Sequence, residues 1–250
     1  DLNLKFGNAE AMLEATRRIP TREGELGDLL ADGPVEAARK LGKGSEDFTI
    51  HVKGMVPAGF EVRGIKGMAL AFAVAPRGAD HLTSCFYALE MSGSFWDFED
   101  YDRTKMTGKA IALKSMEDLM TVYDMTGMCK FSRGIMYEEG LRELVNAITG
   151  FDLSNSELLA AGERVYNISK AFNTREGFSR KDDQLPRRVI REEIPDGPSK
   201  GEKISREQFE SELDRYYTVR GWNGDGTPLR NTLRELDLPK VAEEVGVGQE

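Results

Sequence analysis

Apolar residues recur every three or four positions over several stretches of the chain, which is the spacing of one buried face of an α-helix. This spacing predicts helices over residues 8–19, 26–41 (with a break at 32–34), 66–75, 102–123 and 138–148, and further helices that begin near residues 155, 206, 227 and 239. Strict alternation of apolar and polar residues, the pattern of a half-buried strand, occurs only over residues 48–52. The pattern therefore predicts a mainly α fold built of irregular helical domains.

The character of the chain changes near residue 52, where amphipathic helical patterns give way to a segment punctuated by glycine and proline. Beyond it, the helix predicted over residues 66–75 is apolar almost all round and should be central and buried. We therefore predict two domains, with residues 1–52 as the end of one helical domain and residues 53–250 as another. Residues 80–100 are expected to form an ordered aromatic loop.

Composition and charge exclude several classes of protein. The 250 residues carry 43 acidic and 34 basic side chains, a formal net charge of −9, which disfavours nucleic-acid binding because that needs clustered basic residues. No apolar run is long enough to cross a membrane, and the first residues lack the basic and apolar regions of a signal peptide. The two cysteines lie far apart, which fits a reducing cytoplasm better than a disulfide scaffold. Because no initiator methionine is present, we expect a piece of a longer chain.

The candidate chemistry is concentrated between Tyr123 and Phe131. A helix-spaced apolar run leads into this stretch and a glycine-containing segment leads out of it, so it should be a helix end with free backbone groups. Asp124 is either exposed, paired with an arginine such as Arg133, or an acceptor for the N–H groups of a heterocycle. Cys129 is either a packed apolar residue or a thiolate ligand favoured by the neighbouring Lys130.

The chain has only two histidines. His81 follows the buried helix and lies in the aromatic stretch, where a histidine is either a packed structural residue or a proton carrier near neutral pH. His51 lies in the strand-like run, where a histidine is more often a packed or surface residue than a catalyst. We assign Cys85 to packing.

Asp124-Met125-Thr126-Gly127-Met128-Cys129 resembles the DxxGL(C/D) pterin motif of the tungsten-containing aldehyde:ferredoxin oxidoreductases. Further stretches resemble segments of the same family in the same order, namely Leu4–Glu10, Lys53-Gly54, Arg63-Gly64, Gly67–Ala71, Arg77–His81, Arg164–Asn167, Arg180–Pro186 and Tyr216–Trp222. The resemblance covers nearly the whole chain. It implies the C-terminal part of that fold, with residues 1–52 as the end of domain 2 and residues 53–250 as domain 3.

In that family two pterins hold a tungsten or, in some members, a molybdenum ion, and a neighbouring 4Fe-4S cluster relays electrons to ferredoxin or an electron-transfer subunit. The resemblance implies that Asp124 hydrogen-bonds a pterin ring, to which Gly127 and Met128 present backbone groups. It also implies that Cys129 is the fourth thiolate of the cluster, and thiolate is a ligand suited to iron–sulfur centres.

The resemblance assigns three more residues. His81 would approach the metal and move a proton during the oxidation of an aldehyde, and Lys130 would lie beside the pocket. Phe60 would line the substrate pocket at a position where some members have a tyrosine, so this chain would lack the hydrogen bond of that hydroxyl.

Taken together, the resemblance implies a cytoplasmic enzyme that oxidises aldehydes to carboxylic acids, and a homo-oligomer is compatible with it. Two alternatives stay open, the tungsten subunit of an aromatic acyl-CoA reductase and a cofactor-free helical interaction domain. The family's other cluster cysteines, its other pterin motif and its catalytic glutamate lie outside these 250 residues. We therefore expect the chain alone to hold neither cofactor and to be inactive.

Overall fold

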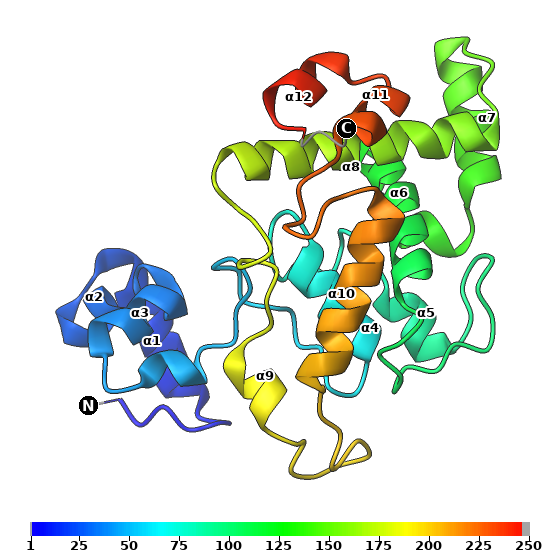
Figure 1. The fold of residues 1–250 in the computed structure, drawn as a ribbon. Helices are drawn as coiled ribbons and strands as arrows, with labels where there is room; N and C mark the ends of the chain where they lie inside the picture. The colour runs from blue at the N-terminus through cyan, green and yellow to red at the C-terminus, as the bar shows by residue number, and fades with distance from the viewer. Residues whose placement is uncertain (1, 247–250) are drawn as a thin grey trace.

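The fold consists of helices joined by irregular loops over residues 2–246, the part of the chain that a computed structural model describes (Figure 1). The elements are α1 (Ala9–Thr21), α2 (Gly24–Leu30), α3 (Gly33–Leu41), the short 3₁₀ helix η1 (Ser45–Phe48), α4 (Lys66–Val74), α5 (Tyr87–Ser92), α6 (Ala110–Thr126), the 3₁₀ helix η2 (Lys130–Gly134), α7 (Glu138–Thr149), α8 (Asn155–Arg175), α9 (Arg187–Arg191), α10 (Arg206–Arg220), α11 (Arg230–Glu235) and α12 (Pro239–Glu244). Within these residues pairing is limited to three isolated β-bridges, which confirms the mainly α prediction.

The helices form two groups that Figure 1 shows side by side. Helices α1–α3 make a small group next to the N-terminus, and α4–α12 make the larger group. The segment that joins them contains residue 52, where the sequence predicts a domain boundary, and that boundary stays a prediction. Among residues 2–246, no helix combines the length and the apolar character that a membrane crossing needs.

Helix α4 is the centre of the larger group, as its all-round apolar sequence predicts. Every residue from Gly67 to Val74 is buried. Gly67 is required because a Cβ there would lie 2.2 Å from the ring of Phe86. The carboxylate of Glu90 accepts the backbone N–H groups of Gly67 at 2.8 Å and Met68 at 2.9 Å, and so satisfies donors that the first turn of α4 leaves free.

Helix α6 carries the candidate motif at its C-terminal end and packs against α8 and α10. Its contact with α8 is close, because a Cβ on Gly162 of α8 would lie 2.3 Å from the carbonyl oxygen of Asp118. Its contact with α10 contains a buried ion pair at 2.6 Å between Glu117 and Arg220, whose side chains are both fully buried. These contacts fix the position of the helix end that follows.

Several local predictions need correction. The strand expected over residues 48–52 is wrong: η1 ends at Phe48, and Val52 forms only an isolated bridge with Met55. The helix expected from residue 102 begins at Ala110, where Glu212 of α10 accepts the backbone N–H of Ala110 at 2.8 Å. The stretch 80–100, expected to be a loop, contains the short helix α5.

Candidate functional site

The motif lies where α6 ends, as the sequence predicts. Gly127 adopts the left-handed conformation (φ +68°), which is typical of the glycine that terminates a helix. Its N–H donates to the carbonyl of Asp124 at 3.2 Å, and the N–H of Met128 donates to the carbonyl of Tyr123 at 3.1 Å. The chain then turns through Cys129 into η2, so Asp124 and Cys129 lie on either side of one tight turn.

Asp124 is held by a lysine. Its Oδ2 is 2.8 Å from the Nζ of Lys130, which also donates to the carbonyl of Leu82 at 2.8 Å. The Lys130 side chain is 8% exposed, whereas that of Asp124 is 59% exposed. Oδ1 of Asp124 has no hydrogen-bond partner among residues 2–246 and remains available as an acceptor. The alternative pairing of Asp124 with Arg133 is therefore wrong, because Lys130 takes that place.

The two cysteines have opposite environments. Cys129 is exposed, so its interpretation as a packed apolar residue is wrong. Cys85 is fully buried, and burial raises the pKa of its thiol. The assignment of Cys85 to packing agrees with this burial, and of the two thiols that of Cys129 is the exposed one.

His81 lies in a small aromatic cluster with Phe60 and Tyr87. The ring centroid of His81 is 5.6 Å from that of Phe60 and 5.8 Å from that of Tyr87, and the latter two rings stack at 4.7 Å. Burial raises the pKa of Tyr87, so its phenol is neutral near pH 7. The imidazole ring therefore lies beside the stacked pair of Phe60 and Tyr87, at a similar distance from each.

Arg133 connects this cluster to the motif. One terminal nitrogen of its guanidinium donates to the Tyr87 hydroxyl at 2.7 Å, and the other donates to the carbonyl of Lys130 at 2.7 Å. Asp124, Lys130, Arg133, Tyr87 and His81 therefore form one continuous chain of contacts. Sequence patterns assigned no role to Tyr87, because a single tyrosine in an aromatic-rich stretch carries no spacing signal.

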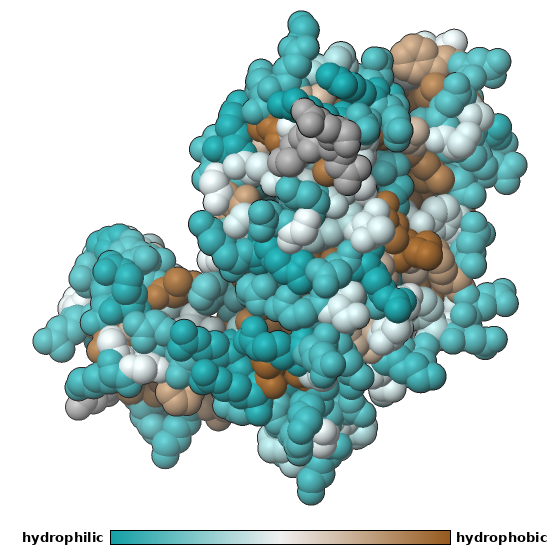
Figure 2. All heavy atoms as spheres, in the orientation of Figure 1, coloured by the Kyte–Doolittle hydropathy of each residue, from teal (hydrophilic) through white to brown (hydrophobic). Residues whose placement is uncertain are grey.

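The surface beside the motif is apolar and incompletely covered. Phe131 is 85% exposed and Ile135 is 88% exposed, and Met125 is also exposed, whereas Met128 packs against buried core residues. Figure 2 shows apolar areas along the edge of the larger group that carries α7. Large exposed apolar patches commonly mark a surface that contacts a ligand or another protein segment.

Three features test whether the site fits the cofactors that the family implies. Within residues 2–246 no three His, Cys, Asp or Glu side chains gather as a metal site, so these residues offer a cluster only the thiol of Cys129. Asp124 offers a free carboxylate oxygen. Arg133 has no carboxylate partner in this part of the chain, and its buried Nε has no hydrogen-bond partner, which leaves positive charge for an anionic group. These groups fit one side of a site that other residues must complete.

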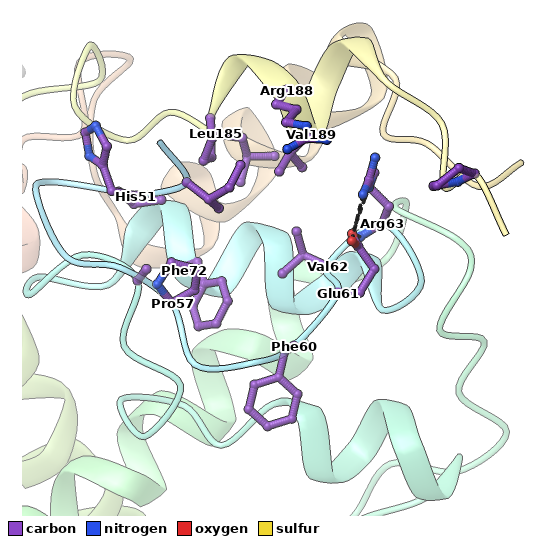
Figure 3. Close-up of a pocket in the computed structure, with 15 residues that line it drawn as sticks. His51, Pro57, Phe60, Glu61, Val62, Arg63, Phe72, Leu185, Arg188 and Val189 are labelled. Carbon is purple, nitrogen blue, oxygen red and sulfur yellow. Dashed lines mark hydrogen bonds and ion pairs between the residues drawn. The ribbon is translucent and has the colours of Figure 1, made fainter. Parts of the chain in front are cut away.

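A separate pocket of about 280 Å³ adjoins the aromatic cluster. It lies between the loop around Phe60, helix α4 and the start of α9, as Figure 3 shows. The ring of Phe60 turns away from Leu185 and Val189 on the opposite wall (Figure 3) and stacks on Tyr87. Phe60 therefore separates this pocket from His81.

The chain matches known proteins over almost its whole length. Residues 1–238 match the family model described as aldehyde ferredoxin oxidoreductase, domains 2 and 3. The tungsten-containing aldehyde ferredoxin oxidoreductase of Pyrococcus abyssi is 33% identical over 235 residues, which cover 94% of this chain and 37% of that protein. The protein of the same name from Pyrococcus furiosus is 31% identical, covering 94% of this chain and 38% of that protein.

Two other proteins are more distantly similar. The WOR-like subunit of an aliphatic sulfonate oxidoreductase from Pyrococcus furiosus is 27% identical, covering 97% of this chain and 37% of that protein. The active site complex BamBC of benzoyl coenzyme A reductase shares the fold with a TM-score of 0.75 and 21% identity, covering 97% of this chain and 41% of that one. The chain thus spans well under half of the length of these relatives.

Proposed function

Because the chain belongs to the aldehyde ferredoxin oxidoreductase family, we propose that it forms one side of the active site of a tungsten-containing enzyme that oxidises aldehydes. The reaction converts an aldehyde and water into a carboxylic acid, two protons and two electrons. The electrons would leave through a 4Fe-4S cluster to ferredoxin or an electron-transfer subunit. The observation that carries the proposal is the chain of contacts that joins the motif, through Lys130 and Arg133, to His81.

The turn at the end of α6 would bind the pterin. Lys130 fixes one oxygen of Asp124 and leaves the other free to accept an N–H group of the ring. The backbone at Gly127 and Met128 lies at the same turn and would contact the ring. A carboxylate at a helix C-terminus is unfavourable without a positive partner, and the buried ammonium of Lys130 is that partner.

Cys129 would provide one thiolate to the cluster. When bound, the tungsten–pterin group would take up two electrons from the aldehyde and the cluster would pass them on singly. The chain's part in this is to present an exposed sulfur at a fixed turn, with the remaining ligands coming from other residues. Whether the metal is tungsten or molybdenum does not alter these roles.

His81 would move the proton that water loses when it adds to the aldehyde carbonyl. A histidine suits this role because it exchanges protons near neutral pH. Its ring is held by Phe60 and Tyr87, and their apolar faces would limit the access of bulk water. Phe60 has no hydroxyl, so the side chain itself would make no hydrogen bond to the substrate.

The two cysteines give a matched test in the natural protein, purified without oxygen. We expect Cys129→Ala to lower the iron content and to abolish both the electron paramagnetic resonance signal of the reduced cluster and aldehyde-dependent reduction of a viologen dye. Cys85→Ala should retain all three, because Cys85 is buried away from the surface. Equal iron content and equal signals in the two variants would refute the assignment of Cys129.

The same preparations separate the two alternatives. Reduction of an aromatic acyl-CoA without oxidation of any aldehyde would identify an acyl-CoA reductase. A natural protein free of tungsten, molybdenum and iron after expression in its own host would identify a helical interaction domain. For residues 1–250 produced alone we expect neither metal in stoichiometric amount, and stoichiometric tungsten and iron there would contradict our assignment of the remaining ligands to other residues.

A further inference from the structure

The pocket in Figure 3 has apolar walls drawn from three distant parts of the sequence. Val62 lies in the loop after Phe60 and Phe72 lies on α4, whereas Leu185 precedes α9 and Val189 lies on it. These four side chains are buried, with exposures between 2% and 8%. The apolar side chains around α9 thus close one side of the pocket. Such walls favour the apolar body of a small molecule.

The charged groups at the pocket are already paired. Arg63 forms an ion pair with Glu61 at 2.7 Å, drawn in Figure 3, and donates to the carbonyls of Glu192 and Glu193. Arg188 pairs with Glu192 at 2.7 Å. The pocket therefore offers no free guanidinium to a carboxylate or a phosphate, and an anionic ligand would lose its water of hydration without compensation.

The pocket shares its walls with the surroundings of His81. Phe60 lines the pocket with part of its residue and contacts the His81 ring at 5.6 Å. Ala79, also in the pocket wall, precedes His81 by two residues. A molecule whose apolar end fills the pocket would have to extend past Phe60 to bring its other end to the imidazole.

We infer that this pocket binds the uncharged apolar body of the aldehyde substrate and that Val189 limits its size. This inference rests on the proposed function. The volume of about 280 Å³ lies just below the roughly 300–1,000 Å³ of pockets for drug-sized ligands, which suits a single ring or a short branched chain. Multiply charged coenzyme A thioesters do not match it.

The test compares Val189→Phe with Val56→Phe in the natural, cofactor-loaded protein. Val56 lies in the loop before Phe60 but is exposed and outside the pocket, so it controls for the added ring. We expect Val189→Phe to lower kcat/KM for benzaldehyde about tenfold or more and to change that for acetaldehyde by less than about threefold. Val56→Phe should alter neither. Iron and tungsten contents and the melting temperature establish that each variant is folded and loaded.

Two further measurements keep the inference testable if Val189→Phe misfolds. Val189→Ala enlarges the pocket and should raise the ratio of kcat/KM for 4-isopropylbenzaldehyde to that for benzaldehyde, by about threefold or more. In the unaltered protein, 4-formylbenzoate, an anionic aldehyde of similar shape, should be a much poorer substrate than benzaldehyde. Comparable rates for these two compounds would overturn the inference that the pocket takes an uncharged ligand.

The outcomes distinguish failure of the proposed function from failure of the pocket assignment. If no aldehyde is oxidised by the unaltered protein, the proposed function fails and the inference fails with it. If aldehydes are oxidised but the Val189 variants show the same ratios of kcat/KM among the aldehydes as Val56→Phe, only the assignment of the pocket is overturned.

Discussion

Replacing Arg220 with methionine should loosen α6, the helix that presents Asp124. The guanidinium of Arg220 is fully buried and lies 2.6 Å from Glu117 and 2.6 Å from Asp118 of α6. It also lies 4.0 Å from the ring centre of Tyr166 on α8. One side chain of α10 thus binds α6 and α8, and its loss should be felt at the end of α6.

The loss of stability in Arg220→Met depends on the partners that Glu117 and Asp118 keep when the guanidinium is removed. Asp118 keeps an ion pair with Lys114 at 2.8 Å. Glu117 loses the one cation that it pairs with among residues 2–246 and keeps the hydroxyls of Tyr166 at 2.9 Å and Tyr216 at 2.6 Å. Breaking a buried ion pair by removing one partner costs about 3–5 kcal/mol. Because the two phenol donors still stabilise the charge, we expect the lower end, about 3 kcal/mol, which corresponds to about a hundredfold change in an opening equilibrium.

Hydrogen–deuterium exchange measures that opening locally. In the natural protein carrying Arg220→Met, the core amides of α6 and α10 should exchange about a hundredfold faster, in the regime where reclosing is faster than exchange. Arg191→Met is the matched control, because Arg191 is exposed and forms no ion pair among residues 2–246. Adding Glu117→Gln to Arg220→Met should recover about 1 kcal/mol or more, since the uncompensated charge is gone.

The stability of Arg220→Met should depend on pH through the ionisation of Glu117. Burial raises the pKa of Glu117, and Arg220 opposes that shift; without Arg220 the pKa should rise further. A carboxyl group with a raised pKa binds its proton more tightly when folded, so stability is greatest at low pH and falls as pH rises through the folded pKa. Arg220→Met should therefore exchange faster at pH 8 than at pH 5 after correction for the intrinsic rate. Exchange within threefold of Arg191→Met at both pH values would refute the reasoning.

Two further predictions concern stability. Burial raises the pKa of Asp183, but Lys170 and Lys53 lower it, and the overall direction is down. The Asp183 carboxylate therefore stabilises the fold above the unfolded pKa near 4, and this stabilisation is lost as pH falls through the folded pKa. Asp183→Asn, which leaves both lysines unpaired, should cost about 3–5 kcal/mol in denaturant titrations at pH 7 and less below pH 4; an equal loss at both would contradict it. Gly162→Ala should lower the free energy of unfolding by about 1–3 kcal/mol, because its Cβ would clash with α6. Gly134→Ala is the control and should cause no loss, since a Cβ there meets no atom within 4 Å. Equal melting temperatures of the two variants would contradict this prediction.

Some features of the motif at the end of α6 depend only on neighbouring residues, and others depend on distant parts of the chain. The C-terminal end of α6 and its glycine cap could be predicted, because they depend on residues within one turn of each other. The pairing of Asp124 with Lys130 could not be chosen over an arginine, since it depends on how η2 folds back and on the carbonyl of Leu82, 48 residues away. The grouping of His81 with Arg133 through Tyr87 likewise needed the fold.

The sequence by itself determined the helical class, the buried helix α4 and the start of α8 near residue 155. Each depends on periodicity or on contacts within a few residues, which are readable along the chain. Only the tertiary structure decided that Glu117 and Arg220, separated by 103 positions, are buried, and that the apolar residues around α9 close a pocket. The physical reason is that a charge can be buried only beside a partner, and a pocket exists only between walls, neither of which one segment specifies alone.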